Sequence, residues 1–370
     1  MMNFYNHMKN HFFCLLCLVP ILCFSQEQNS RYSLEVNSFY GKILKHTEEI
    51  SEFTHRNPDG IFLSLNRKTY GEKPWQSLYN YPDYGLTFQY QDMKYDALGH
   101  FYGLYGHYNF YFFKRNLMFR VAQGVAYNTN PYDAKTNPEN QAYGTHWMPV
   151  TYFMLNYKKE NLWNGLGVQA GMSFFHHSNA NLRTPNKSTN TLALNVGAVY
   201  NFETKESLHY IEHKDSVRFT EPIRYNLVFR TGFNESDLVG SGQFPFYVLS
   251  AYIDKRLSRK SAVHVGAEFF IYKYLEGSVW QLSHAPGSTV SPDTDYRKGG
   301  IFVGHELFVN RLSLETQFGY YAYAPLDYLP KIYQRLGLKY YLADEIFMGV
   351  ALKTHAAKAE ALEFALGVRL

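Results

Sequence analysis

Most of the chain after about residue 80 alternates bulky apolar residues with small or polar ones, residue by residue. The C-terminal stretch is the clearest example: Leu362, Phe364, Leu366, Val368 and Leu370 alternate with Glu363, Ala365, Gly367 and Arg369. Successive side chains of a strand point to opposite faces of a sheet. The pattern therefore predicts strands with one apolar face and one face of small and polar side chains.

About 16 segments carry this pattern between Tyr32 and the C-terminus. Short turns such as Asn310-Arg311 join several pairs, and long connections at about 128–145, 179–189, 234–243 and 275–296 fall mostly between them. Short periplasmic turns and long outer loops are typical of outer-membrane barrels. We therefore expect an all-β, transmembrane, antiparallel up-and-down β-barrel of about 12–16 strands. The connection at 204–220 does not fit, because it is long at the end of the short turns.

The N-terminus has the features of a secretory signal. Lys9 precedes an apolar run from about Phe12 to Phe24, and Ser25-Gln26 is a plausible cleavage point. All three cysteines lie in that run, so the mature protein would have none. An alternative, a lipoprotein anchored at Cys23, is disfavoured by Leu22 before it. We expect a cleaved signal peptide over residues 1–25 and one outer-membrane barrel over residues 26–370.

The composition agrees with export to a membrane. Aromatic residues make up 18% of the chain, and Tyr and Trp are typical of the interfacial girdles of barrels. The net charge of +4 comes without a Lys/Arg cluster of the kind that binds nucleic acid. A water-soluble β-sandwich would also alternate, but its polar face would be charged. Here the polar face is rich in Gly, Ala, Ser and Gln, which favours the lumen of a membrane barrel.

The register of residues 166–179 places a histidine and a serine on the apolar face. Leu166, Val168, Ala170, Met172 and Phe174 share one face, and the next two members of that set are His176 and Ser178. If the apolar face meets lipid, a base and a nucleophile lie on the lipid-facing wall near the outer leaflet. That position suits a lipid substrate.

Nucleophilic serine catalysis needs an imidazole beside the hydroxyl, and a third polar group normally orients the imidazole. Asn190 has the same parity as Leu192 and Leu194, so we expect it on the lipid face of the next strand, within reach of His176. Asn179 and the backbone amides of the turn from 179 to 182 are candidate oxyanion donors. A bare His-x-Ser is a weak signal, because a histidine at a strand end is more often a solvated loop residue.

The segment His176-His177-Ser178-Asn179-Ala180-Asn181-Leu182, followed by Pro185-Asn186, resembles the active-site signature of the outer-membrane lipid A 3-O-deacylase (acyloxyacyl hydrolase) family. That signature reads His-x-Ser-Asn-Ala-Gly-Leu, then Pro-Asn, then a Glu on the next strand. The specific match covers about 15 residues, and the chain is longer than the simplest, eight-stranded members. The resemblance implies a metal-independent serine esterase without a cofactor, acting on lipid A.

Carried over by position, the resemblance makes Ser178 the nucleophile, His176 the general base and Asn179 an oxyanion donor. Asn181, a further candidate oxyanion donor, stands where the family has Gly, and Asn tolerates left-handed backbone geometry. Asn190 stands where the family has Glu. Its amide oxygen can orient an imidazole, but it cannot stabilise imidazolium as a carboxylate does.

The sequence thus predicts an outer-membrane lipid A deacylase that releases a fatty acid from lipopolysaccharide of the outer leaflet. The expected partners are lipid A and the membrane, with no nucleic acid, and the oligomeric state stays open. The alternative is a catalytically impaired barrel serving in transport or as a structural protein. Filling of the lumen separates the two, and the bulky inward residues Phe175, Tyr321 and Phe347 favour a plugged interior.

Overall fold

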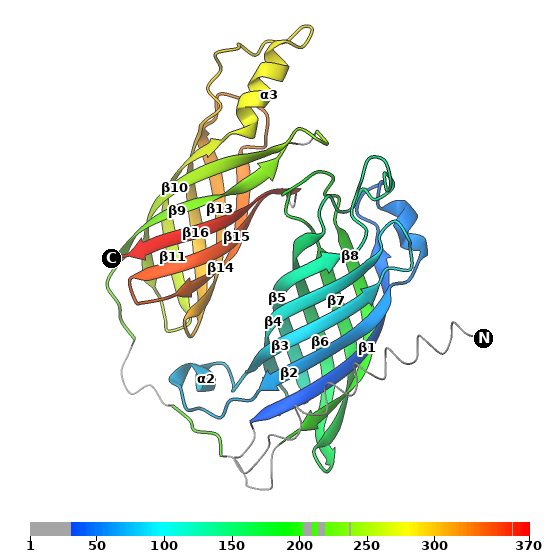
Figure 1. Ribbon diagram of the computed structural model, residues 1–370. Helices are drawn as coiled ribbons and strands as arrows, with labels where there is room; N and C mark the ends of the chain where they lie inside the picture. The colour runs from blue at the N-terminus through cyan, green and yellow to red at the C-terminus, as the bar shows by residue number, and fades with distance from the viewer. Residues whose placement is uncertain (1–30, 203–208, 214–218, 237, 357) are drawn as a thin grey trace, which may run out of the picture.

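The computed structural model describes residues 31–202, 209–213, 219–236, 238–356 and 358–370 (Figure 1). The predicted signal peptide, residues 1–25, lies outside the described residues. Sixteen antiparallel strands lie within them, so the all-β, up-and-down fold is confirmed, but they are divided between two closed barrels of eight strands rather than forming one barrel of 12–16. The described residues include no helix long and apolar enough to cross a membrane.

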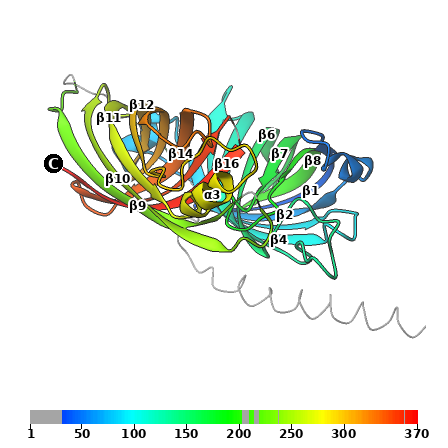
Figure 2. The ribbon, with the colours of Figure 1, turned by 90° about the horizontal axis from the view of Figure 1, so that it is seen from above.

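The strands form two closed barrels that lie side by side (Figures 1 and 2). The first barrel contains β1 (Tyr32–Leu44), β2 (Asp59–Arg67), β3 (Asp83–Asp92), β4 (His100–Phe112), β5 (Leu117–Asn128), β6 (Trp147–Trp163), β7 (Leu166–His177) and β8 (Thr189–Asn201). The second barrel contains β9 (Arg224–Glu235), β10 (Gln243–Arg256), β11 (Ser261–Tyr272), β12 (Lys298–Val309), β13 (Leu312–Tyr323), β14 (Ile332–Tyr341), β15 (Ile346–His355) and β16 (Lys358–Arg369).

Short helices occupy three of the connections. The 3-10 helix η2 (Ser51–His55) lies between β1 and β2, and α2 (Pro74–Leu78) lies between β2 and β3. The longer helix α3 (Tyr274–Ser283) lies between β11 and β12, at the end of the second barrel that carries the long loops (Figure 1).

Two barrels correct the expectation of one barrel over residues 26–370. β1 pairs with β8, for example Ser33 with Asn201, and β16 pairs with β9, for example Arg369 with Asn226. One large barrel and two small ones both remove exposed sheet edges, and both give the same alternation along each strand. The alternation therefore did not distinguish them. The long connection at 204–220 falls in the segment that links the two barrels, which explains why it broke the pattern of short turns.

Paired charges and aromatic rings fill both interiors. In the first barrel Glu35 accepts hydrogen bonds from Arg120 (2.6 Å) and Lys158 (2.8 Å), and all three side chains are buried. In the second, Arg335 binds Glu268 (2.7 Å) and Glu363 (2.6 Å). An eight-stranded barrel is just wide enough for its own side chains. The interiors of the described barrels are therefore packed, and this packing disfavours the transport alternative.

The bulky inward residues lie where the sequence placed them. Phe175, Tyr321 and Phe347 are all buried inside the barrels. The apolar set of each strand faces outward and is exposed, as Leu194 on β8 and Leu366 on β16 illustrate. An exposed apolar belt around a polar interior is the arrangement of a membrane barrel.

The two barrels contact each other at both ends. At the end of the short turns, the Tyr79 hydroxyl donates to the carbonyl oxygen of Phe308 (2.5 Å), and Lys260 Nζ lies 4.7 Å from the centroid of the Tyr79 ring. At the end of the long loops, the connection after β7 bonds to the starts and ends of strands in the second barrel. That second contact involves the candidate site.

Candidate active site

β7 and β8 position the histidine. Outward residues of β7 such as Val168 and Met172 are exposed, whereas inward residues such as Gln169 and Ser173 are buried. His176 belongs to the outward set and is partly exposed. The register of His176 on the outward face of β7 therefore agrees with the prediction. Its neighbour His177 points into the barrel, with its ring centroid 4.2 Å from that of Phe101.

Asn190 holds the histidine. The residue lies directly opposite His176 in the β7–β8 pairing, and its Oδ1 is 2.7 Å from His176 Nδ1. An amide oxygen only accepts, so this contact places the ring proton on Nδ1. The Nε2 lone pair is then free to accept a proton, as a general base requires.

The Ser178 hydroxyl is hydrogen-bonded to groups other than the histidine. Its Oγ donates to Asn186 Oδ1 (3.1 Å) and accepts from the backbone N–H of Ala180 (3.2 Å), and the residue is only 5% exposed. No hydrogen bond between Ser178 and His176 occurs among the described residues. The predicted contact relied on strand parity, but β7 ends at His177 and the chain turns there.

The turn after β7 depends on amide side chains. Asn179 is fully buried, and its Nδ2 donates to the carbonyl of Arg183 (2.6 Å) while its Oδ1 accepts from the N–H of Asn181 (3.0 Å). Ala180 and Asn181 have φ of 54° and 62°. Asparagine is among the residues that adopt this left-handed geometry most readily. Asn181 therefore supports the turn that a glycine would otherwise favour.

Asn181 also ties the turn to the second barrel. Its Nδ2 donates to the carbonyl of Glu235 (2.9 Å), and its own carbonyl accepts from the Glu235 N–H (3.1 Å). The Glu235 carboxylate accepts from the N–H of Thr184 (2.6 Å), and Gln243 Nε2 donates to the carbonyl of Leu182 (2.7 Å). The side-chain amides of both predicted oxyanion residues, Asn179 and Asn181, are thus engaged in holding the turn.

The β1–β2 loop supplies neighbours that sequence reasoning missed. Leu44 pairs with Asn190, and His46 Nε2 lies 2.8 Å from the carbonyl of Lys187. The Glu49 carboxylate binds Lys187 Nζ at 2.7 Å, and this hydrogen bond lowers the pKa of Glu49 to about 2. The first strand could be placed beside the eighth only by knowing that the barrel closes after eight strands.

Asn186 is the second missed residue. Its Oδ1 accepts from both the Ser178 hydroxyl and the Asn179 N–H (2.9 Å), so one amide orients the hydroxyl and the turn together. It lies within the Pro-Asn pair of the signature, which was the available signal. No group of three or more His, Cys, Asp or Glu side chains in the described part of the chain is arranged to hold a metal ion.

Closed barrels with an exposed apolar belt define the chain as a membrane β-barrel protein, and His176, Asn190 and Ser178 form its candidate site. Residues 59–199 match the family model described as lipid A 3-O-deacylase (PagL), and residues 223–370 match the model described as acyloxyacyl hydrolase, C-terminal domain. The two matches cover most of the chain and correspond to the two barrels. The chain belongs to the lipid A 3-O-deacylase (PagL) family.

The family confirms the predicted function at the level of class. The protein is an outer-membrane lipid A deacylase of bacteria, a hydrolase that acts on an ester bond, and its substrate is lipid A of lipopolysaccharide. The family's membrane location agrees with the exposed apolar belt of both barrels.

No curated protein matches the chain. Among solved structures, a mutant porin of Rh. blastica aligns with 10% identity over 92% of this chain and 99% of its own, with a TM-score of 0.19. Omp33 of Acinetobacter baumannii aligns with 9% identity over 93% and 99%, with a TM-score of 0.18. OccK5 (OpdH) of Pseudomonas aeruginosa aligns with 10% identity over 92% and 96%, with a TM-score of 0.22. TM-scores this low carry no argument about arrangement or function.

Proposed function

We propose that the protein deacylates lipid A through Ser178 as nucleophile and His176 as general base, with Asn190 orienting the imidazole. The observation that carries the proposal is the 2.7 Å contact between Asn190 Oδ1 and His176 Nδ1. It selects the tautomer with a free Nε2 on a histidine that faces the lipid. A solvated histidine at a strand end has no need of that partner.

The first step begins with a rotation of the Ser178 hydroxyl from Asn186 toward His176 Nε2. Catalytic hydrogen bonds of this kind are often long or absent before substrate binds. His176 then accepts the hydroxyl proton while Oγ bonds to the acyl carbonyl carbon. Collapse of the intermediate breaks the ester C–O bond, and His176 gives its proton to the departing sugar alkoxide oxygen, which leaves as a hydroxyl. A water molecule, activated by the same histidine, hydrolyses the acyl-serine and releases the fatty acid.

The backbone N–H of Ala180 supports the oxyanion in this proposal. It already points at Ser178 Oγ from 3.2 Å, so it is freed toward the carbonyl oxygen when the hydroxyl moves. Asn179 contributes through its own N–H, which now donates to Asn186 (2.9 Å). Asn181 acts through the turn geometry, because its side chain is bonded to the second barrel. Removing one such donor costs about 10²–10³-fold in kcat in serine hydrolases.

The position of the site suits a substrate that stays in the membrane. Phe174 and Leu192 pair on the outward face next to His176 and Asn190, and both are accessible from outside the barrel. An acyl chain lying against them would reach the base without leaving the apolar phase. The turn follows an outward-running strand, since it lies at the end of the long loops.

The test is mass spectrometry of lipid A from cells expressing the wild type, Ser178→Ala or Ser188→Ala. Ser188 lies at the other end of the same loop and serves as the matched control. We expect loss of one acyl chain with the wild type and with Ser188→Ala, and a decrease in rate of at least about 10³-fold with Ser178→Ala. Full deacylation by a folded Ser178→Ala protein would refute the assignment of the nucleophile.

A further inference from the structure

A second serine–histidine contact lies on the outer surface of the second barrel, at the opposite end of the membrane. Ser261, the first residue of β11, lies with its Oγ 2.6 Å from Nε2 of His305 on β12. Both belong to the outward sets of their strands, between exposed residues such as Val263 and Val303. The pair adjoins the short turn at 257–260, which is the periplasmic end of the barrel.

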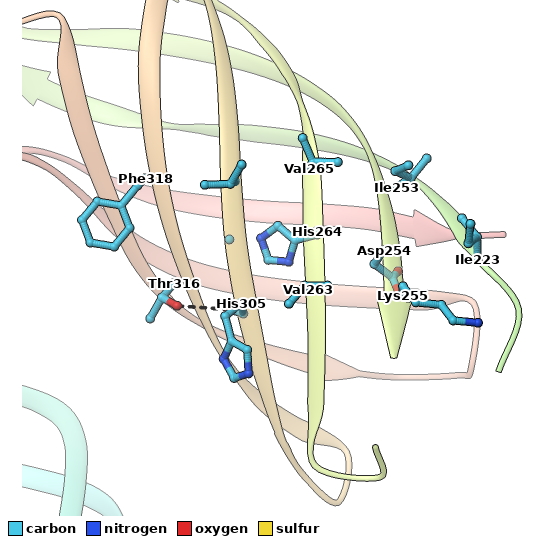
Figure 3. Close-up of a pocket in the computed structure, with 12 residues that line it drawn as sticks. Ile223, Ile253, Asp254, Lys255, Val263, His264, Val265, His305, Thr316 and Phe318 are labelled. Atoms are coloured by element: carbon cyan, nitrogen blue, oxygen red, sulfur yellow. Dashed lines mark hydrogen bonds between the residues drawn. The ribbon is translucent and has the colours of Figure 1, made fainter. Parts of the chain in front are cut away.

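Strand register places His305 in a row across four strands that is polar at three of its four positions. Lys255 on β10 pairs with Val263 on β11, Val263 with His305 on β12, and His305 with Thr316 on β13. The Thr316 hydroxyl donates to the carbonyl of His305 (3.2 Å), as Figure 3 shows. This level of the outer surface therefore presents an ammonium group, an imidazole and the Thr316 hydroxyl. The Ser261 hydroxyl lies one outward position nearer the turn, where Ser261 pairs with Leu307.

The next level toward the membrane centre is entirely apolar. Its members pair across the same strands and are 40–64% exposed: Ile253, Val265, Val303 and Phe318. Together with the polar row they line a hollow of about 530 Å³ on the outside of the barrel (Figure 3). The exposure of these side chains shows that the first barrel does not cover the hollow.

Charge at this end favours an anion. Lys255 is a cation that lines the hollow, and the carboxylate of Asp254, which also lines it, is bound by Arg369 at 2.8 Å. Lys255 Nζ donates to the backbone carbonyl of Glu221, which leaves two ammonium protons for another acceptor. The Glu221 carboxylate is itself bound by Arg369 at 2.7 Å and lies 3.6 Å from Arg256. It is therefore neutralised rather than left to repel an anion at Lys255.

We propose that this hollow binds a glycerophospholipid of the periplasmic leaflet. The phosphate binds Lys255, the ester carbonyl region lies at the level of Ser261, His305 and Thr316, and one acyl chain lies along Ile253, Val265, Val303 and Phe318. With a rise of 3.3 Å per residue and a tilted strand, the polar row is within about 10 Å of the turn. That depth is the interfacial layer of a bilayer, between headgroups and hydrocarbon.

The site binds without hydrolysing. The backbone amides of β11 and β12 that flank Ser261 and His305 are engaged in strand pairing in the described barrel, so they do not serve as oxyanion donors in the way proposed for the Ala180 N–H in the first barrel. Oxyanion stabilisation is usually the largest contribution to acyl transfer, so its absence leaves Ser261 and His305 as ligands for the ester group. Lipid bound at this level contacts four strands of the second barrel.

The test measures lipid binding by the purified full-length protein carrying Ser178→Ala, so that deacylation does not interfere. Native mass spectrometry with phosphatidylglycerol as the probe is expected to show one tightly bound lipid per chain. Lys255→Gln is expected to weaken binding about fivefold or more. Lys159→Gln is the matched control, since Lys159 also faces outward at the periplasmic end of β6 but lies opposite Val168 rather than beside a serine–histidine pair. Its affinity should equal that of the parent.

A phosphate-free diacylglycerol and inorganic phosphate separate the contributions. The proposal predicts weaker retention of the diacylglycerol and no displacement of phosphatidylglycerol by millimolar inorganic phosphate. Equal weakening by Lys159→Gln and Lys255→Gln, or displacement by inorganic phosphate alone, would overturn it. Val303→Trp, which fills the hollow without touching the charge, should also release the lipid. Heat-modifiable migration in gels confirms that each variant is folded.

Discussion

Each barrel carries an outward-facing histidine with a serine nearby, and the surroundings of the two serines differ. In the first barrel His176 is bound by Asn190, and Ser178 lies on an irregular turn with the Ala180 N–H directed at its Oγ. In the second, Ser261 and His305 are in direct contact but lie within paired strands. In the proposed mechanism, side-chain identity and distance do not suffice for an esterase; a turn that places N–H donors near the hydroxyl is also needed.

The largest effect that would test this comparison is at Asn190. Asn190→Leu removes the acceptor that fixes the His176 tautomer, and we expect the deacylation rate to fall about 100-fold. Asn190→Asp keeps the size of the side chain and adds a charge that stabilises imidazolium, so the rate should rise about tenfold. Rates are measured on purified lipid A in detergent. If the Leu variant were as active as the wild type, His176 would not depend on Asn190 and the difference between the two barrels would lose its main support.

The next effect tests whether the second barrel supports the turn of the first. Glu235 accepts from Thr184 N–H at 2.6 Å and from Gly242 N–H at 3.1 Å. A hydrogen bond to a charged group contributes about 1.5–3 kcal/mol, so Glu235→Ala should lower kcat about tenfold and leave KM nearly unchanged. Trypsin should also cleave faster after the exposed Arg183. Glu276→Ala, on α3 of the same barrel, is the matched control; a similar loss there would point to general destabilisation.

The smallest effect concerns Glu49 and Lys187 beside the site. The depressed pKa of Glu49, about 2 against an ordinary 4.5, means that the pair is formed above pH 4.5 and is lost only as pH falls toward 2. Both side chains are exposed, so salt screens the pair. We expect Glu49→Gln to change the deacylation rate less than about twofold, with the same ratio to wild type from about pH 5 to about pH 9. A ratio that varied within that range would show that the protonation of another group near this loop changes the deacylation rate.

Strand positions were predictable because the two faces of every strand lie in the same two environments, the barrel interior and the apolar exterior. The sequence predicts about 16 strands from Tyr32 onward, and Tyr32 is the first residue of β1 among the sixteen strands observed. His176 and Asn190 were also paired from parity alone, since regular strands carry that information over many residues. Barrel closure was not predictable in this way, because the inside–outside alternation is the same in barrels of eight and sixteen strands.

The parts of the site that escaped prediction lie where strand geometry ends. Ser178 follows the last residue of β7, so strand parity does not fix the direction of its hydroxyl, which donates to Asn186 in this structure. His46 and Glu49 approach only because β1 closes onto β8. Glu235 comes from the other barrel. Each of these contacts depends on a turn or on tertiary closure, and no periodic pattern in the sequence encodes either.

Closure in two places also has a consequence for how the chain folds. Each barrel joins its own first and last strands, so neither closing step has to bring together the two ends of the whole chain. The saving in loop-closure free energy is small, about 0.6 kcal/mol for each halving of the loop. The kinetic benefit is larger, because a half-formed sheet with open edges is the species most prone to misassociate. Because each barrel closes once eight strands have formed, rather than sixteen, open sheet edges persist for a shorter time.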